Sequence, residues 1–289
     1  MEFLIEQILN GISTGSVYAI VAVGMTMIFG VLRAINFAHG EYYMLGTFGG
    51  WYAISALGVP YPVAIVIGVA VTAAIAFVIG RLVMERMIGA APEASVVATL
   101  GVSLVLQNSV ILAFGGSYKF FSEGYIEPVF FGDIGIAQQR LLIIGLCILV
   151  FAGLEWMVSH TRIGKAMRAV SQNTEACAVV GIDVRTVVIA TFVLGTSLAA
   201  FSGILTAPVN VSVYGSMGEI ITFKTLPIIV MGGLGNVRGT FIAAMILGIA
   251  ESFVAGQFGL QYRDSVGFVT LILMLLWRPH GLFSSHARF

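Results

Sequence analysis

Charged residues are scarce in this chain of 289 residues. They make up only 10% of the sequence, whereas hydrophobic residues make up 58% and the mean hydropathy is +1.01. Soluble domains carry about 25% charged residues. The composition is therefore incompatible with a soluble fold. Apolar runs near the ~20 residues that a helix needs to cross a bilayer predict an all-α polytopic membrane protein.

Cysteine and metal-binding patterns are also nearly absent. The two cysteines, Cys147 in an apolar run and Cys177 in a polar one, do not suggest a disulfide. The Cys and His residues show no metal-ligand spacing, so we expect no metal site. The formal net charge is +0, which gives no basis for nucleic-acid binding.

The sequence also lacks a catalytic pattern. No Ser-His-Asp set or carboxylate pair has a catalytic spacing. The glycines Gly232, Gly233 and Gly235 resemble a phosphate-binding loop only superficially, because no Gly-Lys-Ser/Thr follows them. We expect a chain that is not an enzyme, binds no cofactor and does not hydrolyse ATP. The glycine cluster is then a tight turn or a close helix crossing.

Apolar stretches divide the chain into candidate membrane spans within one permease-like domain, 1–289. The nine stretches lie near 4–32, 41–58, 60–80, 95–114, 140–158, 187–208, 220–235, 240–256 and 264–277. Two of them, 41–58 and 220–235, are short enough to be re-entrant, so we predict eight or nine crossings. Gly11 to Ser16 favours a break in the first stretch. Residues 115–139 are expected to form an aromatic-rich interfacial loop.

The basic residues predict an orientation. With nine crossings and the N-terminus outside, ten of the fourteen cations face the cytoplasm, as the positive-inside rule expects. The cytoplasmic ones are Arg33, Arg81, Arg86, Arg162, Lys165, Arg168, Arg185, Arg238, Arg278 and Arg288. The four exceptions are Lys119, Arg140, Lys224 and Arg263.

Residues 159–186 form the longest charged segment, which we call the polar island. Four cations in it outnumber two anions. Ala166, Met167, Val170 and Thr174 fall on one face at helical spacing, after Gly164 and before Gly181, which predicts a helix in the middle of the island. A basic helix between two spans is positioned to contact a cytoplasmic partner, or simply to lie on the membrane surface.

Three polar residues, Asn36, His39 and Glu41, stand between the first two apolar stretches. Such groups are costly at membrane depth and usually face a cavity or one another, so they are candidates for a substrate path. The alternative is a helix boundary at which Asn36 is the N-cap of the next helix.

Asn108 and Glu251 are candidates of the same kind inside spans. An interhelical hydrogen bond is the alternative role for each. Lys224 lies near Glu219, and we expect the two to pair with each other or with the membrane interface.

An internal repeat is also conceivable. The junction that follows Met27 to Arg33 resembles the one that follows Ile229 to Asn236, and transporters often contain inverted repeats with broken helices at matching places.

The string Asn36-Phe37-Ala38-His39-Gly40-Glu41 closely resembles a signature of the bacterial permeases that import branched-chain amino acids, the H-type subunit of ABC importers. The resemblance covers essentially the whole chain. Further matching strings are Gly11-x-x-x-Gly15-Ser16, Gly232-Gly233-Leu234-Gly235-Asn236, Tyr262-Arg263-Asp264 and Arg278-Pro279-x-Gly281-Leu282-Phe283. Close relatives of that family import urea or short amides. A stand-alone secondary transporter is the rival from another class.

The resemblance implies partners and a coupling site. Glu175-Ala176-Cys177 followed by Gly181 is similar to the Glu-Ala-Ala-x-x-x-Gly loop that docks on the ATPase in this class, although Cys177 replaces the second alanine. We assign ATPase coupling to these residues and to Arg168. The implied partners are a homologous second permease, two cytoplasmic ATPases that bind ATP, and a periplasmic or surface binding protein, all at the inner membrane.

Overall fold

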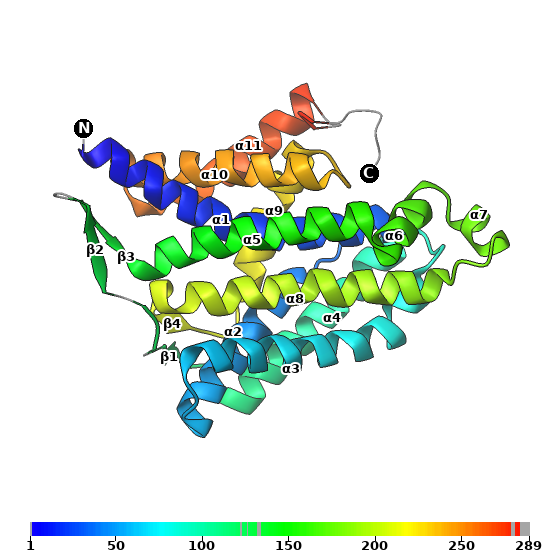
Figure 1. Ribbon diagram of the computed structural model, residues 1–289, viewed down its shortest axis with the longest axis horizontal. Helices are drawn as coiled ribbons and strands as arrows, with labels where there is room; N and C mark the ends of the chain where they lie inside the picture. The colour runs from blue at the N-terminus through cyan, green and yellow to red at the C-terminus, as the bar shows by residue number, and fades with distance from the viewer. Residues whose placement is uncertain (1, 122, 126, 132–133, 279–280, 284–289) are drawn as a thin grey trace.

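The chain folds into an elongated bundle of helices (Figure 1). The computed structural model describes residues 2–121, 123–125, 127–131, 134–278 and 281–283. The long helices in this part of the chain are α1 (Glu2–Leu32), α2 (His39–Leu57), α3 (Tyr61–Leu82), α4 (Pro92–Phe114), α5 (Gln138–His160), α8 (Val184–Asn210), α9 (Met217–Gly232), α10 (Val237–Phe258) and α11 (Arg263–Trp277). Each predicted apolar stretch is one of these helices, so the all-α prediction is confirmed.

Short elements connect them. They are the helices α6 (Arg162–Gln172) and α7 (Thr174–Val179), the 3-10 turns η1 (Met84–Met87) and η2 (Leu260–Tyr262), and the strands β1 (Lys119–Phe120), β2 (Pro128–Phe131), β3 (Ile134–Ala137) and β4 (Ser212–Val213). Strand β2 forms an antiparallel hairpin with β3, and β1 pairs with β4. The connection 115–139 is thus partly strand rather than an irregular loop.

Not every long helix can cross a membrane unaided. Among the described residues, six helices are long and apolar enough: α1, α3, α4, α5, α8 and α10. The others are α2, α9 and α11, of which α9 has 16 residues and α11 has 15, below the ~20 that a span needs. The two stretches that were predicted to be short enough for re-entrance, 41–58 and 220–235, correspond to α2 and α9. The stretch 264–277, predicted as a full span, corresponds to α11 and is not among the six. Two predicted tail features, Pro279 and Arg288, lie outside the described residues.

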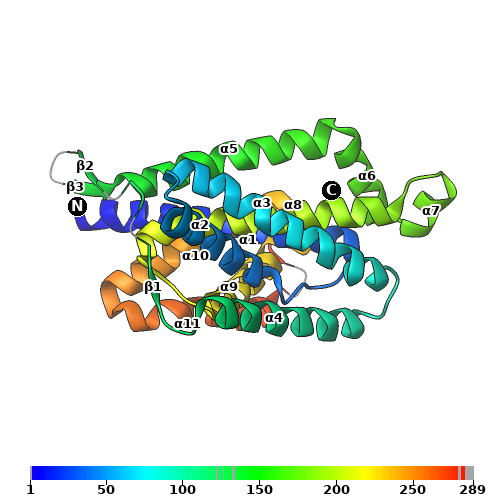
Figure 2. The same ribbon diagram turned by 90° about the horizontal axis from the view of Figure 1, so that it is seen from below.

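The bundle has two distinct ends (Figure 2). The hairpin end carries the start of α1, the strands and the start of α11, and the island end carries α6 and α7. Ion pairs at the island end join Arg185 to Glu85 and Arg238 to Glu155. Basic residues therefore gather at the island end, as the positive-inside count predicts. The cytoplasmic location of this end stays a prediction.

Helices α1 and α8 form the centre of the bundle. The most apolar part of α1 is 83% buried and that of α8 is 67% buried, whereas the corresponding parts of α4 and α5 are only 17% buried. The outer helices therefore present apolar side chains outward, as a surface in contact with lipid requires.

Helix α2 begins inside the bundle rather than at its surface. The Nε2 atom of its first residue, His39, is 3.0 Å from the carbonyl oxygen of Val21. Val21 is eleven residues before the end of α1, which corresponds to about 16 Å at the α-helical rise of 1.5 Å per residue. The segment between α1 and α2 thus returns to about half depth before α2 starts.

The long helices are arranged as an inverted repeat, α1 to α4 and α8 to α11. Helix α1 runs from the hairpin end to the island end, and α8 runs in the opposite direction (Figure 1). The contacts are reciprocal: a Cβ on Gly24 would lie 2.4 Å from the carbonyl oxygen of Gly195, and one on Gly195 would lie 2.6 Å from that of Gly24. Gly40 of α2 and Gly218 of α9 contact each other in the same reciprocal way.

This arrangement corrects the predicted repeat. The segment after α1, residues 33–38, corresponds to residues 211–216 after α8, and not to the glycine-rich segment that begins at Ile229. That segment is the tight turn between α9 and α10, where Gly233 and Gly235 have φ of 87° and 86°, a conformation that glycine adopts without strain.

The predicted break in the first apolar stretch is absent, because α1 is continuous from Glu2 to Leu32. Its glycines serve helix packing instead. A Cβ on Gly11 would lie 2.7 Å from the Cα of Ile249, and one on Gly248 would lie 2.4 Å from the Cα of Gly15. This is the close approach of small residues that membrane helices use in place of a hydrophobic driving force.

Candidate functional site

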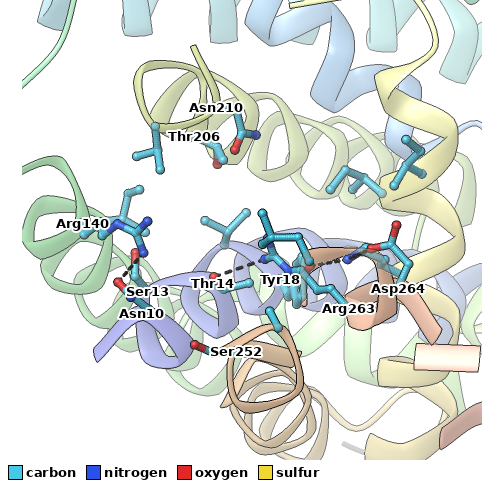
Figure 3. Close-up of a pocket in the computed structure, with 18 of the residues that line it drawn as sticks. Asn10, Ser13, Thr14, Tyr18, Arg140, Thr206, Asn210, Ser252, Arg263 and Asp264 are labelled. Carbon is cyan, nitrogen blue, oxygen red and sulfur yellow. Dashed lines mark hydrogen bonds and ion pairs between the residues drawn. The ribbon is translucent and has the colours of Figure 1, made fainter. Parts of the chain in front are cut away.

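A polar cavity of about 780 Å³ opens near the hairpin end (Figure 3). Its walls come from α1, α5, α8, α9, α10 and α11. The charged or polar lining residues include Asn10, Ser13, Thr14, Tyr18, Arg140, Thr206, Asn210, Lys224, Ser252, Arg263 and Asp264. Polar groups gathered at this depth in a membrane bundle mark a water-filled path or a binding site.

Glu251 anchors an ionic network beneath the cavity. Its side chain is fully buried. Its Oε2 atom accepts hydrogen bonds from the Tyr18 hydroxyl at 2.6 Å, from Lys224 Nζ at 3.0 Å and from Arg263 Nε at 3.1 Å. One buried carboxylate thus has two cationic partners and a hydroxyl donor, which offsets the cost of desolvating it.

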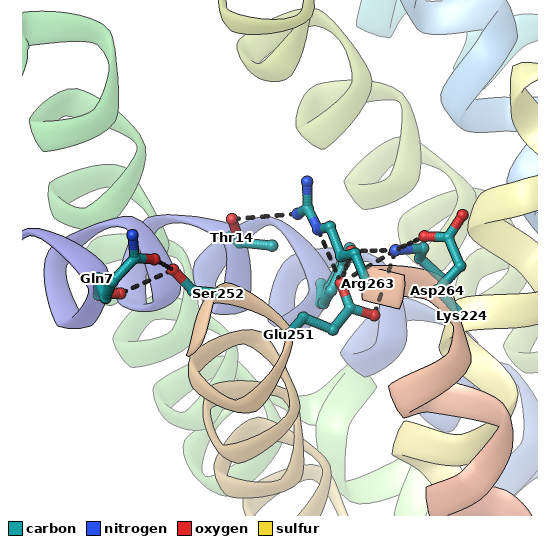
Figure 4. Close-up of polar contacts among 8 residues, drawn as sticks. Gln7, Thr14, Lys224, Glu251, Ser252, Arg263 and Asp264 are labelled. Carbon is teal, nitrogen blue, oxygen red and sulfur yellow. Dashed lines mark hydrogen bonds and ion pairs between the residues drawn. The ribbon is translucent and has the colours of Figure 1, made fainter. Parts of the chain in front are cut away.

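Lys224 links this buried carboxylate to a second one. Its Nζ atom lies 2.7 Å from Asp264 Oδ1 and 2.8 Å from the Tyr18 hydroxyl. The predicted pair with Glu219 is not the one that forms, because Lys224 on α9 points toward α10 and α11 (Figure 4). With Glu251 and Arg263 included, the four ionic side chains sum to zero charge.

Arg140 faces the network from another wall of the cavity. It projects from the start of α5, and its Nη1 atom donates to Asn10 Oδ1 at 2.6 Å. The cavity therefore presents a cation on two sides and a carboxylate, that of Asp264, on one. An ion or dipole with both signs of charge is the ligand that such walls accommodate.

The three polar residues at the start of α2 do not line this cavity. Asn36, His39 and Glu41 are all buried. The Asn36 side chain accepts from the backbone nitrogen of Ala38, while Ser103 of α4 donates to Glu41 at 3.0 Å. Asn36 is not the N-cap of α2, since that position is Ala38, which makes no side-chain cap bond. These residues brace the interior start of α2.

The two candidates inside spans have different surroundings. Glu251 lies directly beneath the cavity through its bonds to Tyr18, Lys224 and Arg263. Asn108 is exposed on α4, outside the cavity, and donates to the carbonyl of Leu104 in its own helix at 2.8 Å. The structure thus brings only Glu251 of the predicted path residues to the cavity.

The polar island folds into a pair of short helices, α6 and α7, at the far end of the molecule. The predicted helix exists, but it begins at Arg162 with Thr161 as N-cap, and it ends before Thr174. Gly164, which was predicted to precede the helix, lies inside it. This position suits glycine, because a Cβ there would be 2.4 Å from the carbonyl oxygens of Met157 and Val158 in α5. Thr174 instead begins α7, where Asn173 is the N-cap.

The residues assigned to coupling lie together on this pair. Glu175 and Ala176 are exposed on α7, and Cys177 is buried. Arg168 is half-buried and donates to the carbonyl of Val158. Gly181 has a φ of 82°, a left-handed conformation that glycine adopts without strain.

A capping residue lies directly after the pair. Asp183 caps α8 and accepts hydrogen bonds from the hydroxyl and backbone of Thr186. These bonds lower the pKa of the Asp183 carboxyl below its ordinary value, so it remains ionised at neutral pH.

Sequence reasoning missed Arg140, Arg263 and Asp264 as site residues. A signal was available, since three of the four cations that break the positive-inside pattern are Arg140, Lys224 and Arg263, and all three line the cavity. A cation on the disfavoured side of a membrane protein is costly unless something binds it. The exceptions to the rule were thus the informative residues.

Comparison with known proteins places the chain in a family. The family model described as "Branched-chain amino acid transport system / permease component" matches residues 7–277. The permease protein BraD of Pseudomonas aeruginosa is 33% identical over 291 residues, which cover 96% of this chain and 95% of that protein. The permease protein LivH of Escherichia coli K12 is 29% identical over 299 residues, with 97% and 95% covered. Both are named as high-affinity branched-chain amino acid transport system permease proteins.

A solved structure supports the fold. The structure of PsaBC from Streptococcus pneumoniae in complex with Fab matches with a TM-score of 0.53 at 13% identity, covering 95% of this chain and 92% of that one. With the helical membrane architecture and a family match over nearly the whole length, the chain belongs to the permease components of branched-chain amino acid transport systems, multi-pass proteins of the inner membrane.

Proposed function

We propose that this chain is the permease subunit of an ABC importer that carries branched-chain amino acids into the cell. The match of the family model to residues 7–277 carries the proposal. The polar cavity with both signs of charge supports it, because an amino acid is a zwitterion with an apolar side chain. Urea and short amides are uncharged, so they would form no ion pairs with the charged groups of the cavity.

The proposed importer contains a second, homologous permease, two cytoplasmic ATPases that bind ATP, and a substrate-binding protein. The helix pair α6–α7 is the proposed ATPase contact. It ends in two exposed apolar side chains, Val179 with 88% and Val180 with 74% of its surface accessible. Exposed valines outside a membrane span are suited to a protein groove.

Force applied to α6 has a direct route into the bundle. The Arg33 guanidinium, at the end of α1, donates to the carbonyl oxygens of Ser171 and Gln172, at 3.0 and 3.2 Å. Because α1 lines the cavity, a displacement of α6 by the ATPases would reach the substrate path through α1. Alternating access of this kind is how transporters with inverted repeats operate.

The test is substrate-stimulated ATP hydrolysis in liposomes. The chain would be reconstituted with the permease, ATPase and binding-protein subunits encoded beside it, and leucine, isoleucine, valine, urea and short amides would be added in turn. Stimulation by the branched-chain amino acids is the expected result. Stimulation by urea or amides alone would refute the substrate. Uptake that continues when the ATPase sites are inactivated would instead favour a secondary transporter.

A further inference from the structure

Arg263 and Asp264, adjacent at the start of α11, both line the cavity (Figure 3), and each keeps polar atoms that the ionic network does not use. The Arg263 guanidinium uses Nε for Glu251 and Nη2 for Thr14, at 3.1 and 3.4 Å, and it also interacts with the Tyr18 side chain. A guanidinium has five N–H donors, so these contacts leave donors of Arg263 for a ligand. Asp264 uses Oδ1 for Lys224, and its Oδ2 has no partner in the described part of the chain.

The network below holds these two groups in place. Glu251 fixes the guanidinium from beneath, and Lys224 bonds to both Glu251 and Asp264. The Arg263 side chain is 35% exposed and that of Asp264 is 63% exposed, whereas Lys224 is 11% exposed and Glu251 is fully buried. Helix α11 therefore presents one positive and one negative group to the cavity, and the charges that balance them, on Lys224 and Glu251, lie deeper. Arg140 of α5 is a further cation on another wall.

We propose that Arg263 and Asp264 bind the backbone of an α-amino acid on its way through the permease. The carboxylate of the substrate accepts from the guanidinium of Arg263, and its ammonium group donates to Asp264 Oδ2. This inference rests on the proposed function and deepens it, because it assigns recognition of the zwitterion to two residues of the permease itself.

The apolar lining provides for the side chain of the substrate. Met217, Ile220 and Ile221 of α9 line the same cavity as the charged pair of α11. A branched aliphatic side chain would contact these residues while the backbone contacts α11. Both charged residues remain partly in water, where ion pairs are weak, so the site releases what it binds, as a transport path requires.

The charged pair can be changed without removing the network. In Asp264→Asn, Lys224 keeps its bonds to Glu251 and to the Tyr18 hydroxyl. In Arg263→Gln, Glu251 keeps Lys224 and Tyr18. Matched controls are Lys119→Gln and Glu127→Gln, which make the same charge changes near the hairpin end but outside the cavity.

The measurement is leucine imported per ATP hydrolysed by the full importer in liposomes, with leucine-loaded binding protein at saturation. Docking of the binding protein stimulates the ATPases, whereas transfer of leucine requires the cavity. We therefore expect Arg263→Gln and Asp264→Asn to lower leucine per ATP at least fivefold while stimulated ATPase activity stays near wild type. Arg263→Lys, which keeps the charge, should recover part of the loss, and the controls should match wild type.

The outcomes separate this inference from the proposed function. Wild-type leucine per ATP in both cavity variants would overturn the zwitterion site and leave the permease function standing. A wild-type importer that assembles, hydrolyses ATP and moves no leucine would overturn both. If Arg263→Gln does not assemble, Asp264→Asn decides the question, because Asp264 is mostly exposed and its replacement leaves every bond of Glu251 intact.

Discussion

Glu251→Gln tests whether the buried ionic network holds α10 to its neighbours. The substitution keeps the size of the side chain and removes its charge. The network joins α1, α9, α10 and α11, because Tyr18, Lys224 and Arg263 all donate to the one carboxylate. Removing the negative charge of Glu251 leaves the Arg263 guanidinium without its carboxylate partner.

The expected cost is large because the Glu251 carboxylate is fully buried. Breaking a buried charge pair by removing one partner costs about 3–5 kcal/mol, which is roughly two to three and a half orders of magnitude in the unfolding equilibrium. The matched control is Glu155→Gln. Glu155 pairs with Arg238, whose side chain is 75% exposed, and exposed pairs contribute about 0–1 kcal/mol. The same chemical change should therefore have very different effects at the two sites.

The assay is equilibrium unfolding of the purified chain in mixed micelles, followed by circular dichroism or tryptophan fluorescence. Glu251→Gln should shift the transition strongly toward lower denaturant, and Glu155→Gln should hardly move it. Equal shifts for the two variants would refute the reasoning, since they would mean that burial adds nothing to the energy of the Glu251 network.

Three further predictions concern helix packing and coupling. Gly24→Leu should destabilise the chain by about 3 kcal/mol, because its Cβ would overlap the α8 backbone, whereas Gly101→Leu should be neutral in the same unfolding assay, because nothing lies within 4 Å of a Cβ there. Glu175→Lys, at an exposed site, should abolish stimulated ATP hydrolysis while the variant inserts and folds normally; transport at the wild-type rate would contradict the assigned contact. Arg33→Ala removes two charge-assisted bonds worth about 1.5 kcal/mol each between α1 and α6, so uptake should fall by about tenfold or more with ATPase binding intact.

The polar island shows which structural features a sequence pattern can predict. The helical spacing of apolar residues in the polar island, 159–186, predicted a helix in its middle, and α6 (Arg162–Gln172) confirms it. The same pattern could not show that Gly164 belongs inside that helix, because the reason is a contact with the end of α5. Periodicity records which face of a helix is apolar, and it does not record how closely another backbone approaches.

The inverted repeat was misplaced for a related reason. Similar residues after Met27 and after Ile229 suggested matching junctions, but the real correspondence joins 33–38 with 211–216, which share little sequence. Reciprocal packing of Gly24 on Gly195 and of Gly40 on Gly218 defines the repeat. Symmetry in a membrane bundle is a property of helix contacts and directions, and different residues can produce the same contacts.

The amino-acid sequence by itself determined the membrane location, the positions of the long helices and the family, because apolar run length and short motifs are local properties. It also supplied a clue to the site, in the cations that violate the positive-inside pattern. Only the tertiary structure decided that Glu251 neutralises Lys224 and Arg263. It also decided that four of the predicted path residues, Asn36, His39, Glu41 and Asn108, do not line the polar cavity. Tyr18, which also donates to Glu251, is separated from it by 233 residues along the chain, and the energy of a buried charge depends on which groups surround it in space.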